Sequence, residues 1–280
     1  MGLFDWLNKK EDEISQDLPL KKDINFASFK DVTDYIYKLS GIIDLDKRAL
    51  TSSRLQQYAV SEDVYSTEEF LVKMKNCKIF EQEVINIATV NETFFMRELK
   101  ELEWLVEYVK NSNKKLKILS MPSSSGEEIY SILLLMLQNN IELNRVEING
   151  YDINSNAVTN AQQAEYDEHS LHKIDANIRD KYFEKNEENH YQLYSKIRNH
   201  AYFEQKNIFD LEGCEKNMYD IVLSRNMFIY FDANKREQAL NIICDLLKNG
   251  GIYIKGHADH IHIDHKLEKI EYGIYKKRIL

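Results

Sequence analysis

The chain has 280 residues, of which 43% are hydrophobic, which excludes a disordered protein and gives room for one large or two modest domains. Its formal net charge of -9 comes from acidic residues spread along the sequence, which argues against a nucleic-acid-binding surface as the main function. The apolar run at residues 132–137 is too short to span a bilayer, and no signal-peptide pattern opens the sequence, so we expect a cytoplasmic protein.

The first part of the chain is predicted to be helical. Apolar side chains repeat along one helical face at Val32, Tyr35, Ile36 and Leu39. Gly41 follows as a stop signal, and further helices are expected over residues 66–76 and 80–88. We therefore expect an all-α N-terminal domain at residues 1–95, followed by a linker helix within residues 96–114.

From residue 115 to 280, apolar strands alternate with amphipathic helices. The expected strands cover residues 116–121, 146–153, 219–226 and 251–257, and the expected helices cover residues 127–137, 155–164 and 234–247. This alternation predicts an α/β domain with a mostly parallel sheet and helices on both faces. The polar and aromatic segment at residues 171–203 breaks the pattern, and we expect it to form a small antiparallel β insertion.

Candidate ligand-binding groups follow the predicted strands, because α/β sheets bind ligands outside the carboxyl ends of their strands. They are the turn at residues 123–126, Asp152, and the triplet Ser224, Arg225 and Asn226. The turn has neither the glycines of a dinucleotide site nor the lysine of a P-loop, so a nucleoside without a diphosphate, such as S-adenosylmethionine, fits better. Two questions stay open. Asp152 either binds a ribose or caps a helix, and Glu127 with Glu128 are either an acid/base pair or first-turn acids that answer a helix dipole.

The histidine-rich segment GHADHIHIDH suggests a metal site at first sight. Its histidines are His257, His260, His262 and His265. Alternation along a strand would divide these side chains between two faces, so we expect no metal here. The three cysteines, Cys77, Cys214 and Cys244, have no metal-ligand spacing and suggest a reducing compartment.

Several spaced motifs together resemble those of the CheR-type chemotaxis receptor methyltransferases. They are NETFFMRE at residues 91–98, SSSGEEIYS at 123–131, YDIN at 151–154, YDIVLSRNMFIYFD at 219–232 and LKNGGIYIKGH at 247–257. The resemblance covers nearly the whole chain, including the segment LSGIIDLDKRALTSSRL in the helical part. It implies a Rossmann-like domain that binds S-adenosylmethionine and releases S-adenosylhomocysteine.

By position, the resemblance assigns a role to each site residue. Asn91, Thr93 and Arg97 would contact the cofactor, Glu128 its amino group and Asp152 its ribose. Asn207 and Ile208 would lie by the adenine, and Ser224, Arg225 and Asn226 would line the pocket floor. Tyr230 would stand near the methyl group, with Arg97 where the substrate enters. Departures such as Met96, Ile129 and Ser224 remove no polar contact.

The resemblance also implies the reaction, which is methyl transfer to glutamate side chains on cytoplasmic helices of methyl-accepting chemotaxis receptors. A glutamate is already ionised at neutral pH, so no general base is needed. Some members grip a receptor's C-terminal pentapeptide with a glycine-containing hairpin in the β insertion. Residues 171–203 contain no glycine, which predicts independence of that pentapeptide.

A basic strip is expected to meet the acidic receptor. Lys47 and Arg54 lie two helical turns apart with Arg48 beside them, so they would share a docking face; the alternative is an ordinary solvated face. We expect a monomer that approaches the membrane only through receptors and binds no nucleic acid. The competing hypothesis is a non-catalytic sensor or scaffold that binds S-adenosylmethionine.

Overall fold

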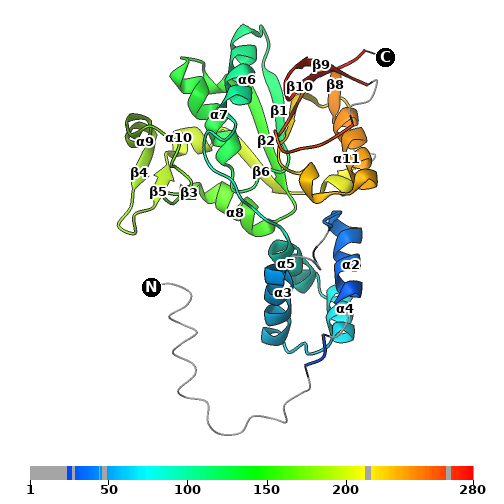
Figure 1. The fold of residues 1–280 in the computed structure, drawn as a ribbon. Helices are drawn as coiled ribbons and strands as arrows, with labels where there is room; N and C mark the ends of the chain where they lie inside the picture. Colours follow the sequence, from blue (N-terminus) through cyan, green and yellow to red (C-terminus); the bar gives the residue numbers. More distant parts are fainter. Residues whose placement is uncertain are drawn as a thin grey trace.

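A computed structural model describes residues 24–26, 29–43, 45, 49–211, 216–262 and 266–279. A helical part and an α/β part are joined by a single crossing segment (Figure 1). The helical part contains α2 (Lys30–Ser40), α3 (Ala49–Ser61), α4 (Thr67–Asn76) and α5 (Lys78–Ala88). None of the described helices is long and apolar enough to cross a membrane.

The predicted apolar face of α2 forms part of the helical core. Val32 and Ile36 are fully buried, and Tyr35 and Leu39 pack against the same cluster. Gly41 ends the helix in the left-handed conformation, with φ of 75°, and its N–H bonds the carbonyl of Tyr37 at 2.7 Å. An L side chain rarely adopts this conformation, which explains the glycine.

The α/β part is built on a seven-stranded sheet with the order β6-β2-β1-β7-β8-β10-β9. Its strands are β1 (Leu116–Ser120), β2 (Val146–Asp152), β6 (Ala201–Gln205), β7 (Tyr219–Ser224), β8 (Leu247–Lys255), β9 (Leu267–Glu271) and β10 (Ile274–Lys277). The first five in this order run parallel, and β10 is antiparallel to both β8 and β9. The predicted Rossmann-like α/β fold is confirmed.

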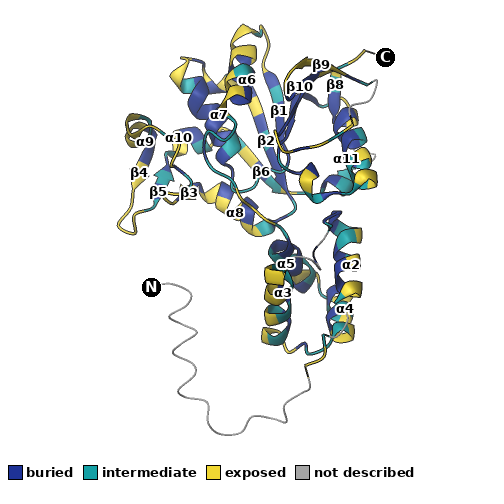
Figure 2. Cartoon of the chain, viewed as in Figure 1, coloured by how far each residue is buried: buried dark blue, intermediate teal, exposed yellow. Residues whose placement is uncertain are grey.

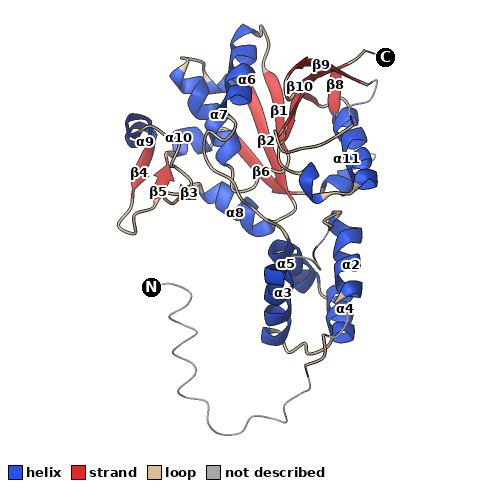
Figure 3. Ribbon diagram, in the orientation of Figure 1, coloured by secondary structure: helices blue, strands red, loops and turns tan. Residues whose placement is uncertain are grey.

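Helices cover both faces of this sheet, as the buried positions in Figure 2 and the layers in Figure 3 show. The longer ones are α6 (Leu99–Asn111), α7 (Glu127–Gln138), α8 (Ser155–Gln163) and α11 (Ala233–Leu246). Leu105 of α6 shares a core with Ile118, whereas the next strand residue, Leu119, packs in a separate core with Ile243 of α11. Successive side chains of β1 therefore point to opposite faces of the sheet and pack in different cores.

The small insertion is a three-stranded antiparallel sheet with the order β3-β5-β4. It contains β3 (Glu165–Tyr166), β4 (Phe183–Lys185) and β5 (Tyr191–Leu193), with α9 (Ala176–Tyr182) and α10 (Ser195–Arg198). Its first strand precedes the expected range of 171–203. The last residues of that range belong to β6, which pairs in parallel with β2 at the edge of the main sheet.

Residues 249–251, the Asn-Gly-Gly run after α11, do not cap this helix. The helix α11 already ends at Leu246, and the two glycines lie inside β8. The register between β7 and β8 shifts there, because Tyr219 pairs with Leu247 whereas Ile221 pairs with Ile252. Gly250, with φ of 76°, allows the extra residues to bulge out of the ladder.

Candidate functional site

A pocket lies between the helical part and the carboxyl ends of β1, β2, β6 and β7. Its floor comes from the loops that follow these strands, and Ser40 and Ile42 reach it from the end of α2. The crossing segment from Ala88 to Arg97 forms another wall. The hollow is open on one side, and its empty volume, open mouth included, is about 1220 Å³.

Most of the predicted site residues line this pocket. They are Asn91, Thr93, Arg97, Glu128, Asp152, Asn207, Ile208, Arg225, Asn226 and Tyr230. Ser224 is the exception, because it is fully buried at the end of β7 and is not among the lining residues.

The crossing segment is held in place by its second aromatic residue. Phe95 is fully buried, with its ring edge-on to Tyr166 at 4.8 Å and to Phe183 at 5.6 Å between ring centres. Its backbone N–H also bonds the carbonyl of Ser170. This anchor fixes the flanking residues Asn91, Thr93 and Arg97 against the pocket, which explains why polar residues surround two aromatics in this motif.

Asp152 is a buried carboxylate, 3% exposed, at the end of β2. One oxygen accepts from the Asn154 N–H at 2.9 Å and the other from the Ser124 N–H at 2.8 Å. Burial nevertheless raises its pKa to about 6. Each oxygen keeps a lone pair for a further donor, so the group suits two adjacent hydroxyls. Asp152 is not the cap of the following helix, because the side chain of Asn154 accepts from the Ala157 N–H and caps α8.

Arg225 joins three parts of the site through a side chain that is 3% exposed. It donates to Glu128 at 2.7 Å, to Glu98 at 3.3 Å and to the backbone carbonyl of Arg97. Burial by itself would raise the pKa of Glu98, but Arg225 and the N–H of His257 hold this pKa below its ordinary value. Glu128 also accepts from the Ser120 hydroxyl, so its carboxylate is fixed at the pocket wall.

Arg97 and Tyr230, which were expected near the substrate entrance, both line the pocket. Arg97 donates to the Glu92 carbonyl at 2.6 Å, and its guanidinium lies 5.8 Å from the centre of the Phe94 ring. Tyr230 ends the short 3-10 helix η3 (Phe228–Tyr230), and its carbonyl accepts from the Ile43 N–H at 3.0 Å.

The loop that carries Asn226 and Tyr230 is fixed by Asp259, which is 1% exposed. Its carboxylate accepts from the N–H groups of Asn226 at 2.6 Å and Phe228 at 2.9 Å. Gly256 leaves the room for this contact, because a Cβ there would lie 2.6 Å from the Asn226 nitrogen. In the sequence Asp259 is only one more acid in a histidine-rich run, so its supporting role was not predicted.

Asn207 and Ile208 lie beyond β6, where adenine binding was expected. Ile208 is buried and begins the 3-10 helix η2 (Ile208–Leu211). The Asn207 side chain donates to the Leu39 carbonyl at 2.7 Å and accepts from the Phe209 N–H at 3.1 Å. Asn207 therefore also ties the end of α2 to the pocket.

The remaining candidate residues that the structure describes do not line the pocket. Arg54 is exposed on α3, whereas Lys47 and Arg48 lie outside the described residues. His257, His260 and His262 are exposed in the loop after β8, so they do not alternate along a strand as supposed, and His265 lies outside the described residues.

Comparison with known proteins gives consistent matches. Residues 91–275 match a family profile described as "CheR methyltransferase, SAM binding domain". A "Chemotaxis protein methyltransferase" of Campylobacter jejuni subsp. jejuni is 31% identical over 87% of this chain and 93% of its own length. "Chemotaxis protein methyltransferase 2" of Vibrio cholerae serotype O1 is 32% identical over 85% of each chain. A relative with the first name in Borreliella burgdorferi is 26% identical over 97% of this chain and 100% of its own.

Proposed function

Because the chain belongs to the CheR methyltransferase family, an S-adenosylmethionine-dependent family, we propose that it methylates glutamate side chains of chemoreceptors. The products would be glutamyl methyl esters on the receptors' cytoplasmic helices, made in chemotactic adaptation. The protein would work in the cytoplasm and reach the membrane only through its receptors.

Asp152 is the observation that carries the cofactor assignment. A buried carboxylate with no cation beside it in the described part of the chain gains most from hydroxyl donors, and a ribose offers two adjacent ones. Glu128 stands at another wall and would attract the ammonium group of the methionine part. Asn207 and Ile208 would border the adenine, with Asn91 and Thr93 on the crossing segment closing the site.

The pocket suits a nucleophile that needs no deprotonation. No histidine occurs among the described residues that line it, and a substrate glutamate is already ionised at neutral pH. S-adenosylmethionine supplies a sulfonium methyl: a carboxylate lone pair forms the new C–O bond, and the electrons of the broken C–S bond stay on sulfur. Arg97 would orient the carboxylate and Tyr230 would wall the site, so positioning and loss of water would provide the acceleration.

Receptor recognition would begin on the helical part. Lys47, Arg48 and Arg54 would form a basic face towards the acidic methylation helix. Such a face raises the rate of encounter more than the final affinity. Exposed Arg54 on α3 is compatible with this assignment.

The small sheet supports docking without a C-terminal pentapeptide. Asn189, with φ of 64°, occupies the left-handed position in the turn between β4 and β5 that glycine would otherwise fill. The Asn186 side chain braces this turn, because it accepts from the N–H groups of Glu188 at 3.0 Å and His190 at 2.9 Å. A glycine-free, braced turn differs from the hairpin described for pentapeptide-binding relatives.

The test is methyl transfer to a receptor cytoplasmic domain from methyl-labelled S-adenosylmethionine, followed by mild base. Label that leaves the receptor as volatile methanol would establish a glutamyl methyl ester. Equal rates on receptors with and without their last five residues would support pentapeptide independence, and a strong loss on truncation would refute it. Tight cofactor binding without base-labile label on any receptor would favour the sensor or scaffold.

A further inference from the structure

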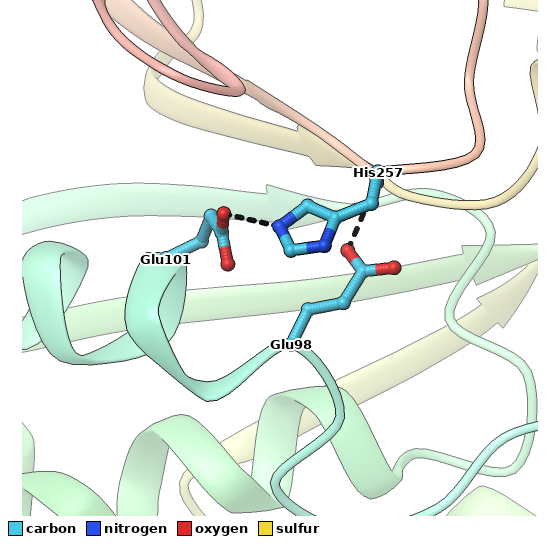
Figure 4. Close-up of side chains that lie close together, drawn as sticks. All are labelled: Glu98, Glu101 and His257. Atoms are coloured by element: carbon cyan, nitrogen blue, oxygen red, sulfur yellow. Dashed lines mark hydrogen bonds and ion pairs between the residues drawn. The ribbon is translucent and has the colours of Figure 1, made fainter.

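Three ligand-type side chains converge just outside the pocket. Glu98 precedes α6, Glu101 lies in its first turn, and His257 follows β8 (Figure 4). One ligand atom from each lies within 4.8 Å of the others. None of the three lines the cofactor pocket, so the proposed function gives them no direct role.

Glu101 is the unusual member of this cluster. It is 5% exposed, and one carboxylate oxygen accepts from or shares a proton with His257 Nε2 at 2.6 Å. The other oxygen, Oε2, is buried and has no hydrogen-bond partner among the described residues. A buried carboxylate oxygen without a donor is costly, and a bound cation is one of the few groups that can satisfy it.

The charges around the cluster point to a cation as well. Glu98 and Glu128 share the guanidinium of Arg225, and Glu101 pairs with His257. The group thus has three carboxylates and one permanent cation, which is an excess of negative charge. The carboxylate side chains are 13%, 14% and 6% exposed, so water screens this excess poorly.

We propose that Glu98, Glu101 and His257 bind a divalent first-row cation, with Zn²⁺ and Mn²⁺ as the best fits. One imidazole with two carboxylates is a ligand set that these ions accept. Ligand atoms about 2.1 Å from one ion lie about 3.4 Å apart in tetrahedral geometry. The ligand atoms lie within 4.8 Å of one another, and an ion between them would replace the 2.6 Å contact between Glu101 and His257 Nε2. The 45% exposed side chain of His257 leaves an open side for water.

The cation would tie the start of α6 to the loop after β8. The loop after β8 also carries Asp259, which fixes the backbone of Asn226 beyond the end of β7. Glu98, before α6, pairs with Arg225, which precedes Asn226. The ion would lie outside the pocket and would not touch the reacting methyl group. Its effect would therefore be to stabilise the walls of the cofactor site.

The experiment titrates Mn²⁺, followed by electron paramagnetic resonance, and Zn²⁺, followed by competition with a coloured chelator, into tag-free, chelator-treated full-length protein. The expected result is one equivalent bound. Glu101→Gln and His257→Gln should weaken binding by roughly tenfold or more. Matched controls are Glu103→Gln, an exposed acid of the same helix, and His260→Gln, an exposed histidine of the same loop. Both controls should bind as wild type.

A measurement on the wild type guards against misfolded variants. Zn²⁺ should shift the imidazole nitrogen signals of one histidine, assigned to His257 by their absence from His257→Gln. The proposal would be overturned if neither ion bound and if the imidazole signals of His257 did not shift when Zn²⁺ was added. Binding that is lost in His260→Gln and kept in Glu101→Gln would overturn it too, since it would place the ion in the histidine-rich loop.

Discussion

Acidification from pH 7 to pH 5 should weaken cofactor binding about tenfold through Asp152. Ribose hydroxyls would donate to its ionised carboxylate, and a proton on that carboxylate removes an acceptor. With a pKa of about 6 in the unliganded protein, the group is almost fully ionised at pH 7 and about one-tenth ionised at pH 5. Because only the ionised form binds well, the dissociation constant rises by the same factor.

The stability of the unliganded protein should move in the opposite direction. The folded pKa, about 6, lies above the ordinary 3.8, so the folded state takes up a proton first as the pH falls. Between these two values, falling pH therefore favours the folded state. From pH 7 to pH 5 this one group should add about 1.3 kcal/mol to the free energy of unfolding.

Calorimetric titration with S-adenosylhomocysteine, which cannot react, measures the first effect between pH 5 and pH 7. Asp152→Asn is the matched control, because its side chain cannot ionise and its dissociation constant should vary little with pH. A flat profile for the wild type would refute the role of Asp152. Equal slopes for both proteins would refute it as well, since another group would then be titrating.

Four further changes test other parts of the structure. Arg225→Met should lower the unfolding free energy by about 3 kcal/mol, because Glu98 and Glu128 lose their buried cation; urea unfolding within about 1 kcal/mol of wild type would contradict this. Gly150→Ala should cost about 1–3 kcal/mol in the same assay, since the new Cβ would lie 2.6 Å from the Phe203 ring; an unchanged midpoint would show that the ring moves aside freely. Arg97→Ala should reduce kcat by about a hundredfold and cofactor affinity much less, if Arg97 orients the attacking carboxylate; full turnover would remove that role. Arg54→Glu should slow receptor methylation at low salt and flatten its salt dependence relative to Arg54→Ala; an unaltered salt profile would leave Arg54 as an ordinary solvated residue.

Much of the fold was predictable because local patterns carry it. The spacing of Val32 and Ile36 predicts the buried face of α2, and the apolar runs around Ile118 and Ile221 predict central strands. β6 was assigned to the wrong sheet, because an edge strand buries only Phe203 and reads as polar. The jump in pairing at Gly250 depends on the neighbouring strand β7, which no local pattern reveals.

Some residues of the candidate site were likewise predictable from the sequence, and others were not. The polar residues at strand ends, such as Asp152 and Arg225, were found because sheet topology brings strand ends together. Asp259 and Glu101 were missed because their partners lie far away in the sequence, Asn226 for the first and His257 for the second. The contact of Glu128 with Arg225 was also not predicted. An acid in the first turn of a helix is already explained by the helix dipole, so the sequence gives no reason to look for a distant partner.

The contacts at the end of α2 make the helical part inseparable from the pocket. Ile43 donates to the carbonyl of Tyr230, and Leu39 accepts from Asn207, so two proposed ligand-site residues also join the two parts. A helical part grafted from a relative would have to reproduce both contacts before the pocket could close. With receptor docking on the helical part, as proposed above, changes in receptor preference and changes in pocket shape should therefore be inherited together.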